Sequence, residues 1–260
     1  MVNLSKNIIL FFFISFSFIF SKNINSINVV TTNDIHGMLA EQEATFMNPN
    51  FPPTIIGAAG FETYLQDLQE IENDFLLLDG GNFFQGHPLG IVDSGRTVIE
   101  WMNKNNYNAL VPGQYDFLFG IDNLINLSKK ADFSFLASNL FYKSQEKLIF
   151  KPYEVFEIKD VKIAVIGVVH PQLSEFVLGN NINDVTIVSG IKSLKRWIPE
   201  IKEKKVDVII LLTSAGVPYD REEKYNSFIE DIKLYSKEDK DNYRCENAIE
   251  LGYFSNDIDI

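Results

Sequence analysis

The sequence predicts an α/β domain with mostly parallel sheets, and the arrangement of its apolar residues supports this prediction in two ways. Short apolar runs bounded by turn-forming residues recur along the chain, as expected for strands buried on both faces. Between these runs, apolar residues are spaced to lie on one face of a helix. A chain of 260 residues, 46% of them hydrophobic, can bury one sizeable core. We therefore expect one domain.

The alternation can be followed element by element. Strands are expected at residues 27–30, 75–78, 109–111, 163–169 and 208–212. Helices are expected around residues 61–68, 98–102, 121–125 and 191–201. Pro199 lies inside the last of these patterns, so that helix should bend or begin late. Residues 147–158 resemble a hairpin region more than a crossover.

The N-terminus has the pattern of an export signal. Lys6 precedes an apolar run at residues 8–20, and Ser21 opens a polar stretch. The run is shorter than the roughly 20 residues that a membrane-spanning helix needs. The alternative is a buried strand or helix. We predict a signal peptide at residues 1–21, a mature domain at residues 22–260, a periplasmic or extracellular location, and no stable membrane anchor.

Charge and cysteine content exclude some functions. The formal net charge is −12, which repels phosphate backbones and argues against nucleic-acid binding. A small anionic substrate remains compatible, because metal ions can supply local positive charge. The single cysteine, Cys245, has no partner for an internal disulfide or a cysteine-based zinc site.

The C-terminal part differs in composition. Residues 220–247 are rich in Asp, Glu, Lys and Asn, which indicates a charged insertion that is either a solvated helix or a mobile excursion. Residues 256–260 then look like the beginning of a strand. On this basis we expect a domain that is incomplete at its C-terminus.

Polar residues cluster directly after the predicted strands. Carboxylate, amide, hydroxyl and imidazole side chains, with glycines among them, occupy these positions: residues 31–37, 79–82, 112–116, 170 and 213–216. In parallel α/β sheets, ligands bind where the strands end, and glycine lets the backbone approach them closely. Asp34 and His36 alone would more often belong to a surface loop, but their position after a buried strand favours a ligand pair. Oxygen donors with imidazole suit Zn, Mn or Fe.

These clusters resemble motifs of one known family, the 5′-nucleotidases within the calcineurin-like metallophosphoesterases. Residues 32–37 (TNDIHG) resemble its opening metal motif, and residues 79–88 (DGGNFFQGHP) resemble its second block. Residues 113–120 (GQYDFLFG) keep the frame of the third block. The segments 98–103, 107–110 and 135–140 are also similar, so the resemblance runs in register from about residue 27 to 216.

The resemblance implies a four-layer α/β sandwich of two mixed β-sheets flanked by helices. It also implies hydrolysis of phosphate monoesters, commonly nucleoside 5′-monophosphates, with two divalent ions such as Zn, Mn, Mg or Fe. By the same resemblance Asp34 and His36 are metal ligands, and both are intact. A small phosphorylated substrate, such as a nucleotide, is the implied partner.

Several implied site positions are altered. Asn82 stands at the position of the bridging carboxylate, Gln114 at an Asn ligand and Ser214 at a His ligand. Tyr115 and Asp116 stand at the positions of the catalytic His and the Glu that follows it. A tyrosine hydroxyl donates a neutral hydrogen bond and carries no positive charge.

Further family features lie beyond the sequence. The final Gly-His-x-His motif, expected directly after Ile260, and the base-binding domain are not in it. A downstream chain could supply this part. His87 and His170 are candidate substitute ligands, and an exposed or structurally hydrogen-bonded His is the alternative for each.

Three functions follow from these departures. The first is a working metallophosphoesterase with an altered site that holds one ion or two. The second is a non-catalytic exported domain that binds a metal ion or phosphate. The third is a truncated product of a larger nucleotidase. The sequence leaves all three open.

Overall fold

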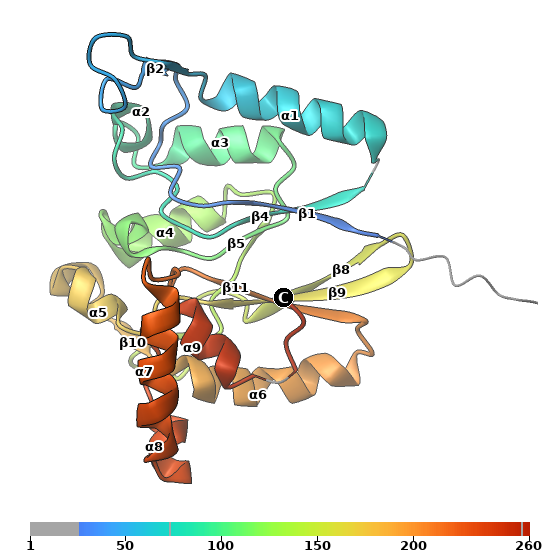
Figure 1. The fold of residues 1–260 in the computed structure, drawn as a ribbon, viewed down its shortest axis with the longest axis vertical. Helices are drawn as coiled ribbons and strands as arrows, with labels where there is room; N and C mark the ends of the chain where they lie inside the picture. The colour runs from blue at the N-terminus through green and yellow to red at the C-terminus, as the bar shows by residue number, and fades with distance from the viewer. Residues whose placement is uncertain (1–25, 73, 256) are drawn as a thin grey trace, which may run out of the picture.

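Two β-sheets lie face to face in the computed structural model, which describes residues 26–72, 74–255 and 257–260 (Figure 1). The predicted leader, residues 1–21, lies outside the described residues. Helices α1 (Ala58–Ile71) and α3 (Arg96–Lys104) lie beyond the first sheet, and α6 (Gly190–Glu203) lies beyond the second. The predicted α/β fold of sheets flanked by helices is confirmed.

The strands of the first sheet all run in the same direction. Its strand order is β1-β4-β5-β6, and each neighbouring pair is parallel. All four strands therefore end at the same edge, which is where ligands bind in such sheets. The strands are β1 (Asn28–Thr32), β4 (Phe75–Asp79), β5 (Ala109–Leu110) and β6 (Ser134–Phe135).

The second sheet is mixed, with the order β11-β9-β8. Strand β11 (Val208–Thr213) pairs in parallel with β9 (Val161–Val168), and β8 (Tyr153–Ile158) pairs with β9 in antiparallel fashion. Lys159 and Asp160, both with positive φ, form the tight turn between β8 and β9. The hairpin therefore extends beyond the predicted region, because β8 finds its partner in the next strand.

The core explains why strand β9 is apolar at successive positions. Ile163 and Val165 pack in the large cluster that also contains residues of β4, whereas Ala164 and Ile166 face the cluster under α6. A strand covered on both faces needs apolar side chains on both. Position 167 in this strand requires glycine, because a Cβ there would lie 2.4 Å from Leu136 Cβ.

The predicted helices are present, with one difference. Helix α6 begins at Gly190 and contains Pro199, so of the two expected alternatives, a bend or a late start, the late start does not occur. Proline removes one helical hydrogen bond and its ring crowds the preceding turn, but the packing of Ile191, Leu194 and Ile198 holds the helix on the sheet. The remaining elements of this part are β2 (Gln42–Glu43), β3 (Thr54–Ile55), α2 (Pro88–Ile91), η1 (Gln114–Phe117), α4 (Gly120–Ser128), β7 (Leu140–Tyr142), α5 (Leu173–Phe176), η2 (Gly179–Asn181) and β10 (Val185–Ile187).

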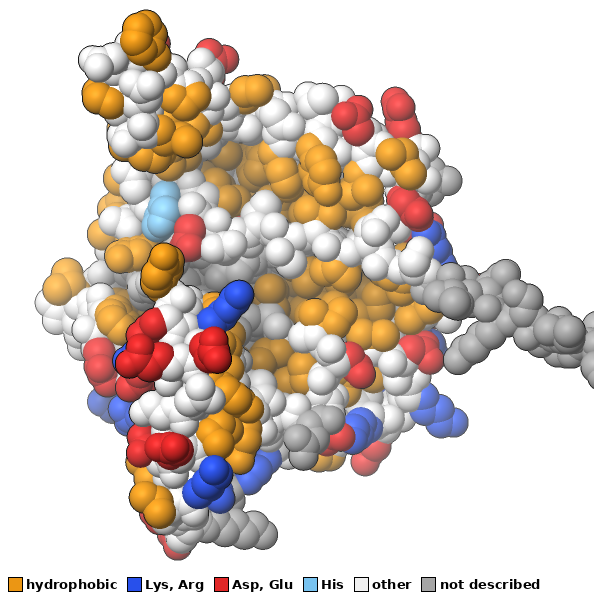
Figure 2. Space-filling view, in the orientation of Figure 1, with side chains coloured by type: hydrophobic (Ala, Val, Ile, Leu, Met, Phe, Trp, Pro, Cys, Tyr) orange, Lys and Arg blue, Asp and Glu red, His pale blue; other side chains and the backbone are white. Residues whose placement is uncertain are grey.

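The C-terminal segment is helical. Its helices are α7 (Arg221–Lys233), α8 (Lys237–Asn242) and α9 (Ala248–Tyr253). Acidic side chains gather over α7 in the space-filling view (Figure 2), but Phe228 is buried against Tyr243 and Phe254. This aromatic contact attaches the charged segment to the domain.

The last residues run along the edge of β11. Asp259 N donates to Ile209 O, and Leu211 N donates to Ile260 O. A strand was expected in this part of the chain. Residues 259 and 260 do bond to β11 through their backbone, but residues 257–260 form no regular strand. Within the described ranges, no helix is long and apolar enough to cross a membrane.

Candidate metal and phosphate site

One cleft of about 550 Å³ receives the loops that follow the strands of both sheets. The first sheet contributes residues that follow β1, β4 and β5, and the second sheet contributes residues that follow β9 and β11. The polar side chains among its lining residues are Thr31, Thr32, Asn33, Asp34, Asn82, Gln114, His170, Thr213 and Ser214. The structure thus brings four of the predicted metal-ligand positions into one cavity, with His36 beside them.

The first two loops are held together along their length. Asp34 N donates to Gly81 O, His36 N to Asn82 O, and Gly37 N to Phe83 O, each at 2.9 Å. The loop after β1 therefore continues alongside the loop after β4. This pairing fixes the distance between the side chains of Asp34 and Asn82.

The backbone at this point is in a sparsely populated conformation. Asp34, His36 and Asn82 have φ values of 53°, 51° and 59°, in the left-handed region. Non-glycine residues adopt this region rarely, and such residues cluster at functional sites. Glycine is needed at position 113, because a Cβ there would lie 2.1 Å from Asn82 Oδ1.

The ring of His36 is held in one orientation by the backbone. Its Nδ1 lies 2.6 Å from the carbonyl oxygen of Gln85. A carbonyl only accepts, so Nδ1 carries the proton and Nε2 keeps its lone pair. Nε2 lies 3.8 Å from Asp34 Oδ1. A second nitrogen held by a backbone carbonyl is the usual arrangement of a metal-binding histidine.

Asn82 is engaged at both ends of its side chain. Its Nδ2 donates to Asp34 Oδ1 at 2.8 Å, and its Oδ1 accepts from Tyr115 N at 3.0 Å. Asn33 Nδ2 donates to the other oxygen of Asp34 at 2.9 Å. Both oxygens of Asp34 are thus hydrogen-bonded to neutral amides, so a cation would compete with these bonds.

Gln114 supplies an unusual acceptor. Its Oε1 is buried and has no hydrogen-bond partner among the described residues. An orphaned buried acceptor calls for an explanation, and a cation in the cleft would provide one. The longer side chain therefore does not prevent Gln114 from lining the cleft.

These donors fit one cation better than two. Asp34 and His36 offer one oxygen and one nitrogen donor close together, and Gln114, whose side-chain oxygen has no partner, lines the same cleft as Asp34. Ser214 Oγ, at the expected His position, accepts a hydrogen bond from His170 N at 3.0 Å. Over the described part of the chain, no group of three or more His, Cys, Asp and Glu side chains is placed to hold a metal ion. A second ion would lack strong ligands.

Asp116 and Tyr115 lie differently from a catalytic pair. The fully buried Asp116 carboxylate accepts from the backbone N–H groups of Asn82, Phe83 and Gly113, at 2.7–2.8 Å. Burial raises the pKa of Asp116 to about 8, against the effect of these donors. Asp116 thus positions the two loops rather than facing a substrate. Tyr115 is half-exposed, and its ring centroid lies 5.6 Å from that of His36.

The two histidines considered as substitute metal ligands, His87 and His170, lie in different places: only His170 lines the cleft. His87 caps α2, where its Nδ1 accepts from Leu89 N, and it does not line the cleft. His170 lines the cleft and is only 8% exposed. Its Nδ1 accepts from Gln172 N at 3.1 Å, which places the proton on Nε2. In this tautomer His170 has no free lone pair for a metal ion.

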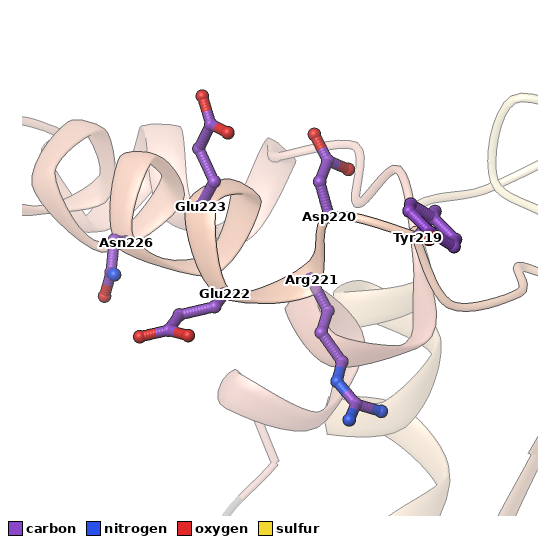
Figure 3. Close-up of a pocket in the computed structure, with 6 residues that line it drawn as sticks. All are labelled: Tyr219, Asp220, Arg221, Glu222, Glu223 and Asn226. Atoms are coloured by element: carbon purple, nitrogen blue, oxygen red, sulfur yellow. The ribbon is translucent and has the colours of Figure 1, made fainter.

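A second hollow lies at the start of α7, and its side chains do not converge. Figure 3 shows Glu223 and Asp220 pointing to one side and Arg221 and Glu222 to the other. Tyr219 is fully exposed. This hollow therefore offers no arrangement of groups around a ligand.

Two contributors to the site were missed from the sequence. Asn33 was present in the first motif, but only its contact with Asp34 shows its role. Gln85 acts through its backbone carbonyl, so its side-chain identity carried no signal.

The fold and the cleft define an α/β domain with a polar cleft at the ends of its strands. The chain belongs to the calcineurin-like phosphoesterase family, whose model matches residues 27–242. It is 28% identical over 201 residues to a 5′-nucleotidase of Homo sapiens, covering 75% of this chain and 35% of that protein. It is 26% identical over 191 residues to a 5′-nucleotidase of Vibrio cholerae, covering 73% and 34%.

A solved structure shows the same fold. The calcineurin-like phosphoesterase YfkN from Bacillus subtilis matches with a TM-score of 0.70 and 24% identity, over 90% of this chain and 70% of that chain. The chain spans about a third of the length of the two curated relatives above. Members of this family are metal-dependent, and hydrolysis is the chemistry associated with the family and its relatives.

Proposed function

We propose that this chain hydrolyses phosphate monoesters, with nucleotides as the substrate class, through one divalent cation bound at Asp34 and His36. The observation that carries this proposal is the His36 ring: Nδ1 is held by Gln85 O and Nε2 faces Asp34. The nucleotide class rests on the similarity to two 5′-nucleotidases.

A divalent cation at this site would neutralise phosphoryl charge and lower the pKa of water. Residues of the chain itself orient the groups of this site. Gln85 O fixes the His36 tautomer, Asp116 holds the loops in register, and Gln114 Oε1 adds an oxygen donor. Zn, Mn, Mg and Fe are the candidate ions, since imidazole suits Zn and Fe and oxygen donors suit Mg and Mn.

We expect hydrolysis to be slow. Asn82 brings no negative charge, and a unit charge about 4 Å from another is worth roughly 4 kcal/mol at an effective dielectric of 20. Tyr115 brings no imidazole to the phosphoryl group. Its ring instead lies against His36.

A non-catalytic binding domain is the second candidate. It is favoured by the hydrogen bonds of Asp34, which satisfy both carboxylate oxygens with neutral amides. Because the chain spans about a third of its relatives, a larger nucleotidase or a downstream chain that completes the site is a related proposal. Export, to the periplasm or outside the cell, is also proposed, from the leader.

Phosphate release from a nucleoside 5′-monophosphate tests this proposal. The purified chain is incubated with Mn²⁺, Zn²⁺, Mg²⁺ or Fe²⁺, and the variant His36→Ala is compared with His87→Ala, which removes a histidine outside the cleft. We expect turnover that depends on metal, that His36→Ala abolishes and that His87→Ala leaves unchanged. Metal binding without turnover would favour the second candidate. Equal turnover in both variants would exclude the proposed site.

A further inference from the structure

The cleft has two walls, and the proposed function uses only one of them. Asp34, Asn82 and Gln114 belong to the loops of the first sheet. His170 and Ser214 follow β9 and β11 on the second sheet. None of the described residues that line this cleft is a lysine or arginine. A bound phosphate dianion therefore depends on neutral donors for its remaining oxygens.

His170 presents a donor in a fixed orientation. Gln172 N donates to Nδ1, so the neutral ring carries its proton on Nε2. The backbone N–H of His170 donates to Ser214 Oγ, and Phe176 packs edge-on against the ring at 5.1 Å. Over the described residues, no hydrogen bond to Nε2 is found.

The neutral form is favoured by the surroundings. Burial lowers the pKa of His170, while the charges of Glu175 and Glu246 oppose that shift. At neutral pH the ring thus keeps Nδ1 as an acceptor for Gln172. A charged ring would place two donors against each other at that contact.

We propose that His170 is a catalytic residue of this cleft, whose Nε2–H donates a hydrogen bond to a non-bridging oxygen of the bound phosphate. The proposal rests on the proposed function and deepens it. It places an imidazole on the second-sheet wall, whereas position 115 on the first-sheet side holds a tyrosine packed against His36. It also argues against the candidate role of His170 as a substitute metal ligand, because Nδ1 accepts a hydrogen bond and Nε2 bears the proton.

Inorganic phosphate and Mn²⁺ are suitable probes. His170→Phe keeps a ring against Phe176 and removes the donor, whereas His170→Gln keeps an N–H donor on a flexible side chain. We expect phosphate affinity in the presence of Mn²⁺ to fall about tenfold in His170→Phe and by less in His170→Gln, since a hydrogen bond to a charged group is lost. Mn²⁺ affinity in the absence of phosphate should not change in either variant.

The outcomes separate the two proposals. A parallel loss of Mn²⁺ affinity would make His170 a metal ligand and overturn the inference. Unchanged phosphate affinity would overturn it while leaving the proposed function intact. A wild-type chain that binds Mn²⁺ but neither binds phosphate nor releases it from a nucleoside 5′-monophosphate would overturn both. If His170→Phe does not fold, the ¹⁵N resonance of Nε2 in the wild-type chain decides: it should shift when phosphate is added with Mg²⁺, and an unshifted resonance would contradict the assignment.

Discussion

The side-chain amide of Asn82 donates a 2.8 Å hydrogen bond to Oδ1 of Asp34. In the two-ion centres that the family motif implies, a carboxylate stands at position 82. Two carboxylates at this distance repel each other unless cations lie between them. The amide removes that repulsion, so the present pair is stable without an ion and attracts one less strongly.

Asn82→Asp should therefore raise the affinity for metal and lower the stability of the metal-free chain. The added charge should raise Mn²⁺ affinity at least about tenfold. Without metal, loss of the amide donor and the new repulsion should lower the free energy of unfolding by roughly 1–3 kcal/mol. Calorimetric Mn²⁺ titration and urea unfolding in chelator measure the two effects. Asn33→Asp is the matched control, because it adds the same charge on the other side of Asp34. Equal Mn²⁺ affinity in both variants would show that charge alone, rather than position 82, controls binding.

Tyr115→His, introduced into Asn82→Asp, should increase phosphate release. Tyr115 is 48% exposed, and its backbone N–H, which any residue supplies, makes the bond to Asn82. The substitution should thus change the free energy of unfolding by less than about 0.5 kcal/mol. An imidazole that reaches the phosphoryl group contributes about 10²-fold or more as an acid–base catalyst. Steady-state assays with Mn²⁺ should show a higher kcat than Asn82→Asp alone. An unchanged kcat would mean that position 115 faces His36 and not the substrate.

The parallel strands and their polar ends could be predicted because two-sided burial and turn residues leave a strong local pattern. The proximity of Asp34 and Asn82 could be predicted from the rule that parallel strands end at one edge of the sheet. The directions in which individual side chains point could not be predicted from the sequence. Asp116 belongs to the same motif as Tyr115, yet it turns inward to backbone N–H groups, which depends on where the loop of Asn82 lies. Similarly, the charge pattern around α7 hid the burial of Phe228, since one aromatic residue attaches a segment that is otherwise solvated.

Asp116→Ala should destabilise the fold and loosen the site. Three backbone N–H groups, from Asn82, Phe83 and Gly113, would lose their acceptor inside the protein. Each unsatisfied donor costs about 1–3 kcal/mol, although water can enter the space that the carboxylate leaves. We expect the free energy of unfolding to fall by about 3 kcal/mol or more in urea titrations. Asp122→Ala, on the exposed face of α4, is the control and should change it by less than about 1 kcal/mol. Similar losses in both variants would exclude Asp116 as the residue that positions the loops.

Asp79 should make stability depend on pH. It is fully buried beneath the site, where Thr32 Oγ1 and Gly81 N donate to its two oxygens. Burial raises its pKa from 3.8 to about 7, with hydrogen bonds from Thr32 and Gly81 acting in the other direction. Between these values the folded chain retains a proton that the unfolded chain has released. Its contribution to stability is therefore fully present below about pH 4 and is lost as the pH rises to about 7.

Asp79→Asn tests this dependence, because an amide does not titrate and Thr32 can rotate its hydroxyl to accept from it. In chelator, the wild-type free energy of unfolding should fall between pH 5 and 7 more steeply than that of the variant, by up to about 1.4 kcal/mol per pH unit for one proton. Asp116 remains in the variant, and its pKa is raised to about 8 by burial and in part by the charge of Asp79. The difference between the two slopes therefore reports Asp79 together with its effect on Asp116. Asp67→Asn, on the exposed side of α1, should keep the wild-type slope. If Asp79→Asn also keeps that slope, Asp79 is ionised in the folded chain throughout this range, and the hydrogen bonds from Thr32 and Gly81 outweigh the effect of burial.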